Sequence, residues 1–338
     1  MNIKLNYNIR LHVNENHFVN PFIEELNLNN SIECFVNYPD SGCCDLAQKM
    51  AGYYNIDVSN LFFGNGLDEI IALLVLCLSR EGEKIIYPEN TFNAYGFCSH
   101  FFHRVSETVK LKDYKIDIAE LLEKIKMGAK IVFLCNPHNP TGSYLSCEEM
   151  LAILQECKNA GTYLVIDEAY YEFCGITLGF LEATSNSNLI ILRTMSKFYG
   201  MAGVRLGYAV STKENIKLLN QIKTFLPFNV NHFAQAYGGI IFDHINKHKK
   251  EILNSFNSAK IFLCNNLEAM SLSYLPSSSN FVTLNLGVDA ANITEKLKTS
   301  GILVRYCKDW NLPELVRVTV GTEAEILVFM ETLGKLLH

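Results

Sequence analysis

The stretch Tyr163-Leu164-Val165-Ile166-Asp167 decides the fold of this chain. Its first four residues form an unbroken apolar and aromatic run, which is typical of a strand covered on both faces of a sheet. The run ends in an acid, and Glu168 follows it. Ligands of a parallel sheet bind beyond the carboxyl ends of its strands, so the pattern predicts that Asp167 faces a functional crevice.

Similar runs on either side of this stretch alternate with helical patterns. The other predicted strands are Leu61–Phe63, Lys84–Tyr87, Val105–Val109, Lys130–Cys135, Leu189–Arg193 and Arg205–Val210. The helices predicted between them include Asp68–Leu78, Ile116–Lys126 and Cys147–Asn159. This alternation predicts an α/β fold with a large domain, in which a mostly parallel seven-stranded sheet is flanked by helices.

The pattern changes after Phe225. A long helical region is predicted over Phe233–Ala269, followed by strands over Asn280–Leu286, Ile302–Tyr306 and Leu315–Val320 and a helix from Glu323. We therefore expect three parts. Residues 1–30 form an arm that packs with the small domain, residues 31–230 form the large domain, and residues 231–338 form a smaller α+β domain.

Composition excludes several classes of protein. The net charge of -6 without a basic run argues against nucleic-acid binding. No apolar run approaches the roughly 18 residues of a membrane span, and no signal-peptide core is visible at the N-terminus. Eleven cysteines without a Cys-x-x-Cys pair indicate reduced thiols, and so a cytoplasmic protein. The nine histidines lead us to expect no metal site.

A lysine, Lys197, follows the predicted strand Leu189–Arg193 through Thr194 and Ser196. A lone lysine is usually a solvated surface charge, and the alternative is a Schiff-base nucleophile. An apolar strand that ends in Asp-Glu also occurs in nucleotide hydrolases, but the Gly-x-x-x-x-Gly-Lys-Ser/Thr loop that they need is absent here.

Two further strand ends carry candidate ligands. One predicted strand is followed by the run Asn136-Pro137-His138-Asn139-Pro140-Thr141-Gly142. This run is either simply a tight loop or a rigid turn that aims the Asn139 amide into a site. A predicted helix begins within the run Gly64-Asn65-Gly66-Leu67-Asp68-Glu69. The exposed backbone N–H groups at the start of a helix bind phosphate. Glu69 replaces the third glycine of a dinucleotide fingerprint, so we expect a cup for a single phosphate.

These motifs resemble those of fold-type I aminotransferases, and within them the histidinol-phosphate aminotransferase group. The resemblance extends in family order over nearly the whole chain. The matching stretches are Asn14–Asn16, Tyr38–Asp40, Gly64–Glu69, Asn136–Gly142, Asp167–Tyr170, Arg193–Gly203, Leu275–Pro276, Asn280–Val282, Val304–Arg305 and Arg317–Thr322.

The resemblance implies a pyridoxal 5′-phosphate enzyme in which Lys197 binds the cofactor as a Schiff base. It implies that Asp167 pairs with the pyridinium nitrogen, that Asn139 and Tyr170 bond the ring oxygen, and that Phe92 stacks on the ring. Lys197, Asp167 and Tyr170 are then the catalytic residues. The residues implied to hold the cofactor phosphate are Gly66, Leu67, Asp68, Thr194, Ser196 and Arg205, with Tyr38 reaching it from the second subunit of a homodimer.

The same resemblance implies a substrate with an anionic group. Arg305 and Arg317, with Asn139, would bind the phosphate of a small phosphorylated ketone and the carboxylate of glutamate as amino donor. Only thirteen residues precede Asn14, so we expect a short N-terminal arm. The acceptor is then either imidazole-acetol phosphate or a smaller phosphoester such as dihydroxyacetone phosphate.

Three alternatives remain open at this point. One is a phospho-amino-acid decarboxylase of the threonine-phosphate decarboxylase type, although its usual His-Gly-Gly signature is absent. Another is an aromatic amino acid aminotransferase with Phe22 and Tyr199 lining an apolar pocket. The third is a regulatory domain that binds the cofactor without catalysis, which should bring a helix-turn-helix segment that has no place in this chain.

Overall fold

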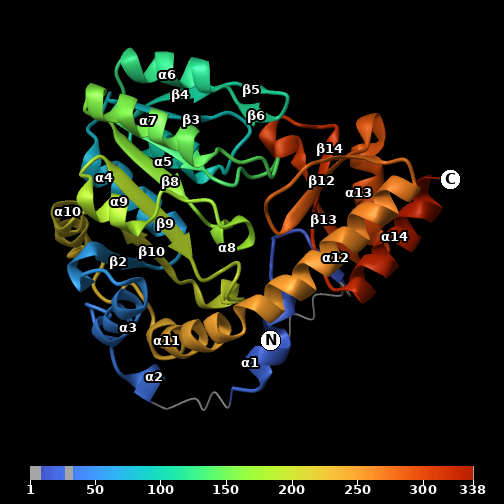
Figure 1. Ribbon diagram of the computed structural model, residues 1–338, viewed down its shortest axis with the longest axis horizontal. Helices are drawn as coiled ribbons and strands as arrows, with labels where there is room; N and C mark the ends of the chain where they lie inside the picture. The colour runs from blue at the N-terminus through green and yellow to red at the C-terminus, as the bar shows by residue number, and fades with distance from the viewer. Residues whose placement is uncertain (1–8, 27–32, 338) are drawn as a thin grey trace.

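The computed structural model describes residues 9–26 and 33–337. Its larger sheet has seven strands in the order β2-β10-β9-β8-β7-β3-β4 (Figure 1). Strand β10 is antiparallel to both β2 and β9, and all other neighbouring pairs of this sheet are parallel, which confirms the mostly parallel sheet. The strands are β2 (Leu61–Gly64), β3 (Lys84–Pro88), β4 (Val105–Val109), β7 (Ile131–Cys135), β8 (Tyr163–Asp167), β9 (Leu189–Thr194) and β10 (Gly207–Val210).

Helices cover both faces of this sheet, because its central strands are apolar on both sides. Phe133 of β7 joins the core under one face, and the next residue, Leu134, joins the core under the other. The first face is covered by α4 (Leu67–Leu78), α5 (Ala94–Phe101) and α10 (Lys213–Lys223). The second is covered by α3 (Cys44–Tyr54), α6 (Ile118–Lys126), α7 (Cys147–Ala160), α9 (Phe180–Ser185) and α11 (His232–Lys247).

A second sheet of five strands lies beside the first, in the order β1-β13-β14-β12-β11. Its strands are β1 (Ile9–Leu11), β11 (Ser273–Leu275), β12 (Phe281–Asn285), β13 (Ile302–Tyr306) and β14 (Leu315–Thr319). The helices α12 (Lys249–Ala269), α13 (Ala290–Thr299) and α14 (Glu323–Leu337) share a core with it. This is the expected α+β unit, in the orange and red part of Figure 1.

The structure corrects several predicted boundaries. The region Phe233–Ala269 is two helices, because the chain leaves helical geometry at His248 between α11 and α12. The helix predicted from Ile116 begins at Ile118, since residues 115–116 pair with 111–112 in a short ladder. The strand predicted from Arg205 begins at Gly207, because Arg205 has a left-handed backbone with φ of 61°. Strands β1 and β11 were not predicted, since three residues are too few to show periodicity.

The remaining described α-helices and strands are short. They are α1 (Asn20–Glu24), α2 (Glu33–Val36), α8 (Tyr171–Cys174), β5 (Leu111–Lys112) and β6 (Lys115–Ile116). Within residues 9–26 and 33–337, no helix combines the length and apolar character needed to cross a membrane. The predicted domain limits, after residues 30 and 230, stay a prediction, and part of the arm lies outside the described residues.

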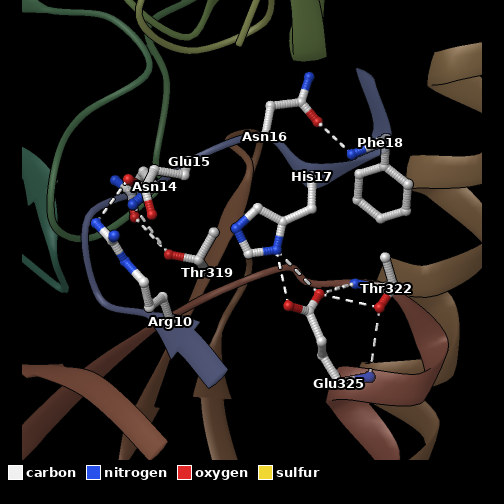
Figure 2. A network of polar contacts seen from close by, with 9 residues as sticks. All are labelled: Arg10, Asn14, Glu15, Asn16, His17, Phe18, Thr319, Thr322 and Glu325. Atoms are coloured by element: carbon white, nitrogen blue, oxygen red, sulfur yellow. Dashed lines mark hydrogen bonds and ion pairs between the residues drawn. The ribbon is translucent and has the colours of Figure 1, made fainter. Parts of the chain in front are cut away.

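The N-terminal segment is fastened to the smaller sheet. Strand β1 pairs in parallel with β13, and beyond it the Asn14 backbone N–H donates to Thr319 Oγ1 at 3.0 Å. An ion pair joins His17 Nδ1 to Glu325 Oε1 at 2.8 Å, at the start of α14 (Figure 2). Residues about 300 positions apart are therefore neighbours, and the chain between β1 and α1 has a defined path.

The His17–Glu325 pair predicts a pH-dependent stability. A hydrogen bond to Glu325 raises the pKa of His17 above its usual value of 6.5. A raised histidine pKa means that the stabilisation is complete below the unfolded value and is lost as pH rises through the folded value. We expect wild type to exceed His17→Gln in unfolding free energy by about 0.5–1 kcal/mol near pH 6 and by almost nothing near pH 9.

Denaturant titrations of both proteins across this range measure the difference. Glu325→Gln serves as the matched control, because removing either partner should abolish the same pH dependence. A difference between wild type and His17→Gln that stays constant with pH would contradict the ion pair.

Candidate active site

A cavity of about 310 Å³ lies where the carboxyl ends of the large sheet meet the smaller one. The sequence-predicted residues that line it are Leu67, Asp68, Phe92, Asn139, Asp167, Tyr170, Thr194, Ser196, Lys197, Arg205, Arg305 and Arg317. A larger cavity of about 740 Å³ borders α10, but its titratable side chains are three lysines without an acid. The smaller cavity, where acids, bases and amides converge, is therefore the candidate site.

Lys197 points its amine into this cavity just past the end of β9. Its Nζ donates to the Val13 carbonyl oxygen at 2.8 Å and lies 6.0 Å from the centre of the Tyr170 ring. Burial, and then the nearby Arg317 charge, lower the pKa of the Lys197 amine to about 8. This lowered pKa makes the unprotonated amine far more populated near neutral pH than in an ordinary lysine, as a nucleophile or a base requires.

Asp167 ends β8 and is 3% exposed. Its Oδ2 accepts from Tyr95 Oη at 2.7 Å, and its Oδ1 accepts from the Ala169 backbone N–H at 3.0 Å. Burial raises the pKa of Asp167 to about 6, although both hydrogen bonds act against this. Among the described residues no cation pairs with it, so the carboxylate is poised for a cationic group of a ligand.

Tyr170 and Asn139 are held by residues from distant parts of the chain. Tyr170 Oη accepts from Asn14 Nδ2 at 3.0 Å, and its ring lies edge-on to Phe281. Asn139 Oδ1 accepts from Arg317 Nη1, which leaves the Asn139 amide nitrogen as a donor toward the cavity. Both side chains are buried, so their orientation is fixed before a ligand arrives.

The start of α4 was predicted to form a cup for a single phosphate, and this stays a prediction. Gly66 caps this helix with φ of 81°, and a Cβ at that position would overlap the guanidinium of Arg205. Arg205 also contacts Asp68 Oδ2 at 3.0 Å and Ser196 Oγ at 3.5 Å. Backbone donors at a helix start, an arginine and a hydroxyl make this end of the cavity suitable for a phosphate.

The two predicted substrate arginines come from neighbouring strands of the smaller sheet. Arg305 of β13 and Arg317 of β14 are register partners, so their side chains lie on one face. Their guanidinium carbons lie 5.0 and 5.2 Å from the ring centre of Trp310. Arg317 is 5% exposed, and its Nε and the Trp310 Nε1 are buried donors without a hydrogen-bond partner among the described residues. Buried donors of this kind indicate a polar ligand.

Several predicted residues lie outside the cavity wall. Gly66 stands behind Arg205, and Tyr38 is 82% exposed and stacks on Phe228. The suggested apolar pocket of Phe22 and Tyr199 is wrong for this cavity. Phe22 packs on His248, and Tyr199 stacks on Phe242 in the core, so neither reaches the site.

Other wall residues were not predicted as site residues. His12, Val13 and Asn14 enter through the N-terminal segment, and Trp310 enters through a short 3-10 turn after β13. Trp310 is the single tryptophan of the chain, which was an available signal. Tyr95, the partner of Asp167, is fully buried on α5 and carries no local pattern that separates it from a core residue.

Comparison with known proteins gives a consistent result. The family model described as aminotransferase class I and II matches residues 2–333. A histidinol-phosphate aminotransferase 2 of Carboxydothermus hydrogenoformans is 31% identical over 305 residues, which cover 89% of this chain and 83% of that protein. A histidinol-phosphate aminotransferase of Symbiobacterium thermophilum is 34% identical over 297 residues, covering 88% and 81%.

The solved structures agree in fold. The crystal structure of histidinol-phosphate aminotransferase from Sinorhizobium meliloti in complex with pyridoxal-5′-phosphate aligns with a TM-score of 0.86 at 24% identity. The alignment covers 98% of this chain and 92% of that one. L-threonine-O-3-phosphate decarboxylase from Porphyromonas gingivalis has the same fold, with a TM-score of 0.77 at 21% identity and coverage of 97% and 99%.

The buried, ionised carboxylate of Asp167 is predicted to lower the stability of the ligand-free protein near neutral pH. Because burial raises the pKa of Asp167 to about 6, the folded state binds more protons than the unfolded chain between the unfolded value and pH 6. Stability therefore falls as pH rises through this window. We expect Asp167→Asn to melt at a higher temperature than wild type near pH 7, with a gain of up to about 3 kcal/mol.

Thermal unfolding of both ligand-free proteins at about pH 4 and pH 7 tests this expectation. The gain should vanish at the lower pH, where Asp167 is protonated. A gain that is equal at both pH values would point to packing rather than to the buried charge.

Proposed function

The chain belongs to the family of class I and II aminotransferases, and from this premise we propose that it transfers an amino group from glutamate to a small phosphorylated ketone. It is a pyridoxal-phosphate-dependent enzyme. The observation that carries the proposal is the set of side chains in one cavity: the Lys197 amine, the buried Asp167 carboxylate and two arginines. Relatives named histidinol-phosphate aminotransferase support the phosphorylated substrate.

The residues present fit the cofactor. Asp167 is a buried carboxylate that lacks a cation among the described residues, and it would pair with the protonated ring nitrogen. Asn139 and Tyr170 would bond the ring oxygen, and Phe92 would cover the ring face. The phosphate would bind at the α4 start, through backbone N–H groups of Leu67 and Asp68 and through Thr194, Ser196 and Arg205. When bound, pyridoxal 5′-phosphate supplies an electron sink for the substrate carbon.

Lys197 is proposed to hold the cofactor covalently and to move the proton of the reaction. A base works best when its pKa lies near the working pH, and burial lowers the pKa of Lys197 to about 8. Its contact with the Val13 carbonyl oxygen keeps the amine inside the cavity without neutralising it. No carboxylate contacts Nζ in the described part of the chain, so the amine is available for covalent bonding.

The substrate anion is proposed to bind between Arg305 and Arg317. Arg317 is fixed by Asn139 Oδ1 and by the His12 carbonyl oxygen at 2.8 Å, while its Nε still lacks a partner. Among the described residues, Arg305 forms an ion pair with Asp309 at 2.8 Å and lies over the Trp310 ring, and its side chain is 38% exposed. A planar guanidinium donates two parallel hydrogen bonds to either a phosphate or a carboxylate, so one pocket can serve the ketone and glutamate in turn.

A homodimer is proposed on the basis of an exposed apolar surface near α2 and the connection between α10 and α11. Its members are Phe35, Val36, Tyr38, Phe225, Leu226 and Phe228, which range from 39% to 85% exposed. Apolar side chains gathered in this way are typical of an interface. Tyr38 within it would reach the cofactor phosphate of the second subunit.

We expect wild type to sediment as a dimer at micromolar concentration, because burying these side chains removes apolar area from water. Phe225→Asp places a charge in the proposed interface and should shift the protein toward monomer. Val288→Asp, at a fully exposed position far from this surface, is the matched control. A wild-type monomer with full activity would exclude the assembly.

A cytoplasmic location is proposed from cysteine chemistry. The chain has eleven cysteines, and Cys43, Cys135, Cys157 and Cys307 are buried free thiols. Burial raises the pKa of Cys157 to about 12, which keeps that thiol unreactive. Many unpaired thiols suit a reducing compartment.

The function is tested by a two-stage assay. The pyridoxamine form is mixed with a panel of phosphorylated and free ketones, including imidazole-acetol phosphate and dihydroxyacetone phosphate. We expect a phosphorylated ketone to restore the yellow absorbance of the lysine-bound cofactor, and a free ketone of equal size to do so poorly. Restoration by free ketones alone, or release of CO₂ from a phosphorylated amino acid, would contradict the proposal.

Two substitutions refine this assay. Lys197→Ala should abolish turnover, because the covalent link and the base are lost together. Arg317→Ala should raise KM for the phosphorylated ketone by roughly tenfold or more. Arg104→Ala is the matched control and should leave KM unchanged. Arg104 lies outside the cavity and donates to the Ser79 carbonyl oxygen at the end of α4.

A further inference from the structure

We propose that Glu25, His244 and His248 form a binding site for a transition-metal ion, with Zn²⁺ the best match, outside the cavity described above. Glu25 follows α1 of the N-terminal segment, and the two histidines lie at the end of α11 and at its junction with α12. One ligand atom from each residue lies within 4.8 Å of the other two. An ion bound there would join the N-terminal segment to the helix junction.

The separations fit a shared ion better than they fit direct contacts. His244 Nε2 lies 3.7 Å from Glu25 Oε2, which is too long for a hydrogen bond. Ligand atoms about 2.0–2.2 Å from a tetrahedral zinc stand roughly 3.4 Å apart, so small side-chain movements complete the site. The ring centres of His244 and His248 are 4.8 Å apart, which lets both rings face one ion.

The ring nitrogens involved have unmet bonding capacity. His244 Nε2 and His248 Nδ1 are both buried from solvent and have no hydrogen-bond partner among the described residues. A buried nitrogen without a partner is costly, and a metal ion satisfies it. The rest of the His248 ring is supported by Phe22 of α1, whose ring centre lies 4.7 Å away. The site is therefore partly built before an ion binds.

The histidines also have the spacing that metal sites use. His244 and His248 are four residues apart, which puts two side chains on one helix face, as in the paired histidines of zinc helices. The sequence-based expectation of no metal site overlooked this pair. The third ligand could not be found in the same way, because Glu25 lies 219 positions from His244 and only the fold brings them together.

The ligand set selects the class of ion. Two imidazoles and a carboxylate suit Zn²⁺ and its neighbours in the transition series, whereas Mg²⁺ and Ca²⁺ prefer oxygen ligands alone. Glu251 carries a second carboxylate 3.6 Å from His248 Nδ1 and adds negative charge. The adjacent Lys249 directs its ammonium over the Tyr171 ring at 5.7 Å, away from this cluster.

A metal ion bound by Glu25, His244 and His248 would restrain the N-terminal segment, which forms part of the wall of the cavity. Upstream of α1, the Asn16 side chain donates to the Phe198 carbonyl oxygen at 2.7 Å, and Val13 accepts from Lys197. A link between Glu25 and α11 restrains the far end of this segment. The metal site itself contains no residue of the cavity, so its test does not depend on the proposed transamination.

The test is calorimetric titration of Zn²⁺ into the full-length, cofactor-loaded protein after removal of metals with a chelator. We expect one zinc per chain, a raised melting temperature at saturating zinc, and no such response to Mg²⁺. His244→Ala combined with His248→Ala should abolish the binding, and Glu25→Gln should weaken it by roughly tenfold. His100→Ala, at an exposed histidine on α5, is the matched control and should bind as wild type does.

Cysteine thiols also bind zinc, so the comparison between variants is decisive. Equal stoichiometry and affinity in wild type and in both ligand variants would overturn the proposal, as would an absence of binding to wild type. If the double variant fails to load cofactor or melts early without metal, Glu25→Gln decides alone, because its side chain is 63% exposed and its loss should not affect folding. Amide exchange across residues 17–25 should slow with zinc only in proteins that bind it.

Discussion

The buried carboxylate of Asp167 is the constraint on which the rest of the site depends. It stands at the end of a fully apolar strand, and Tyr95 and the Ala169 N–H are its only described partners. A folded chain accepts such a group only when the surrounding structure holds it in place. Here β7 and β9 enclose β8 on both sides and helices cover both faces of the sheet. The stability of the sheet thus offsets the free-energy cost of burying the Asp167 carboxylate without a cationic partner.

The opposite wall is built from the smaller sheet and from the chain that precedes α1. Arg317 of β14 bonds both the His12 carbonyl oxygen and Asn139 in the turn after β7, so a single guanidinium connects three separate parts of the chain. Lys197 is held in turn by Val13. The site is therefore a junction between two sheets, and Lys197, Tyr170 and Arg317 are each positioned by a residue from a distant part of the chain.

The sequence predicted the sheet well because the strands are apolar on both faces and end in distinctive residues. It predicted Lys197, Asp167 and Asn139 because each lies at or just beyond the carboxyl end of a strand, and it predicted the two arginines through the family resemblance. It did not predict Tyr95, because a core tyrosine on a helix carries no sign of its hydroxyl's partner. It did not predict β1, since three residues gain strand geometry only from pairing with β13. Long-range contacts, which local patterns do not record, account for both.

The pairing of the first described strand with β13 and the contact of Asn14 with Thr319 have a consequence for biosynthesis. While the chain leaves the ribosome, Lys197 emerges well before the strand that carries Arg317. The nascent protein therefore exposes this amine to solvent, and its pKa falls only when the wall that carries Arg317 encloses it. Strand β1 cannot pair until β13 has been synthesised, so the enclosed site forms only after both sheets have been translated.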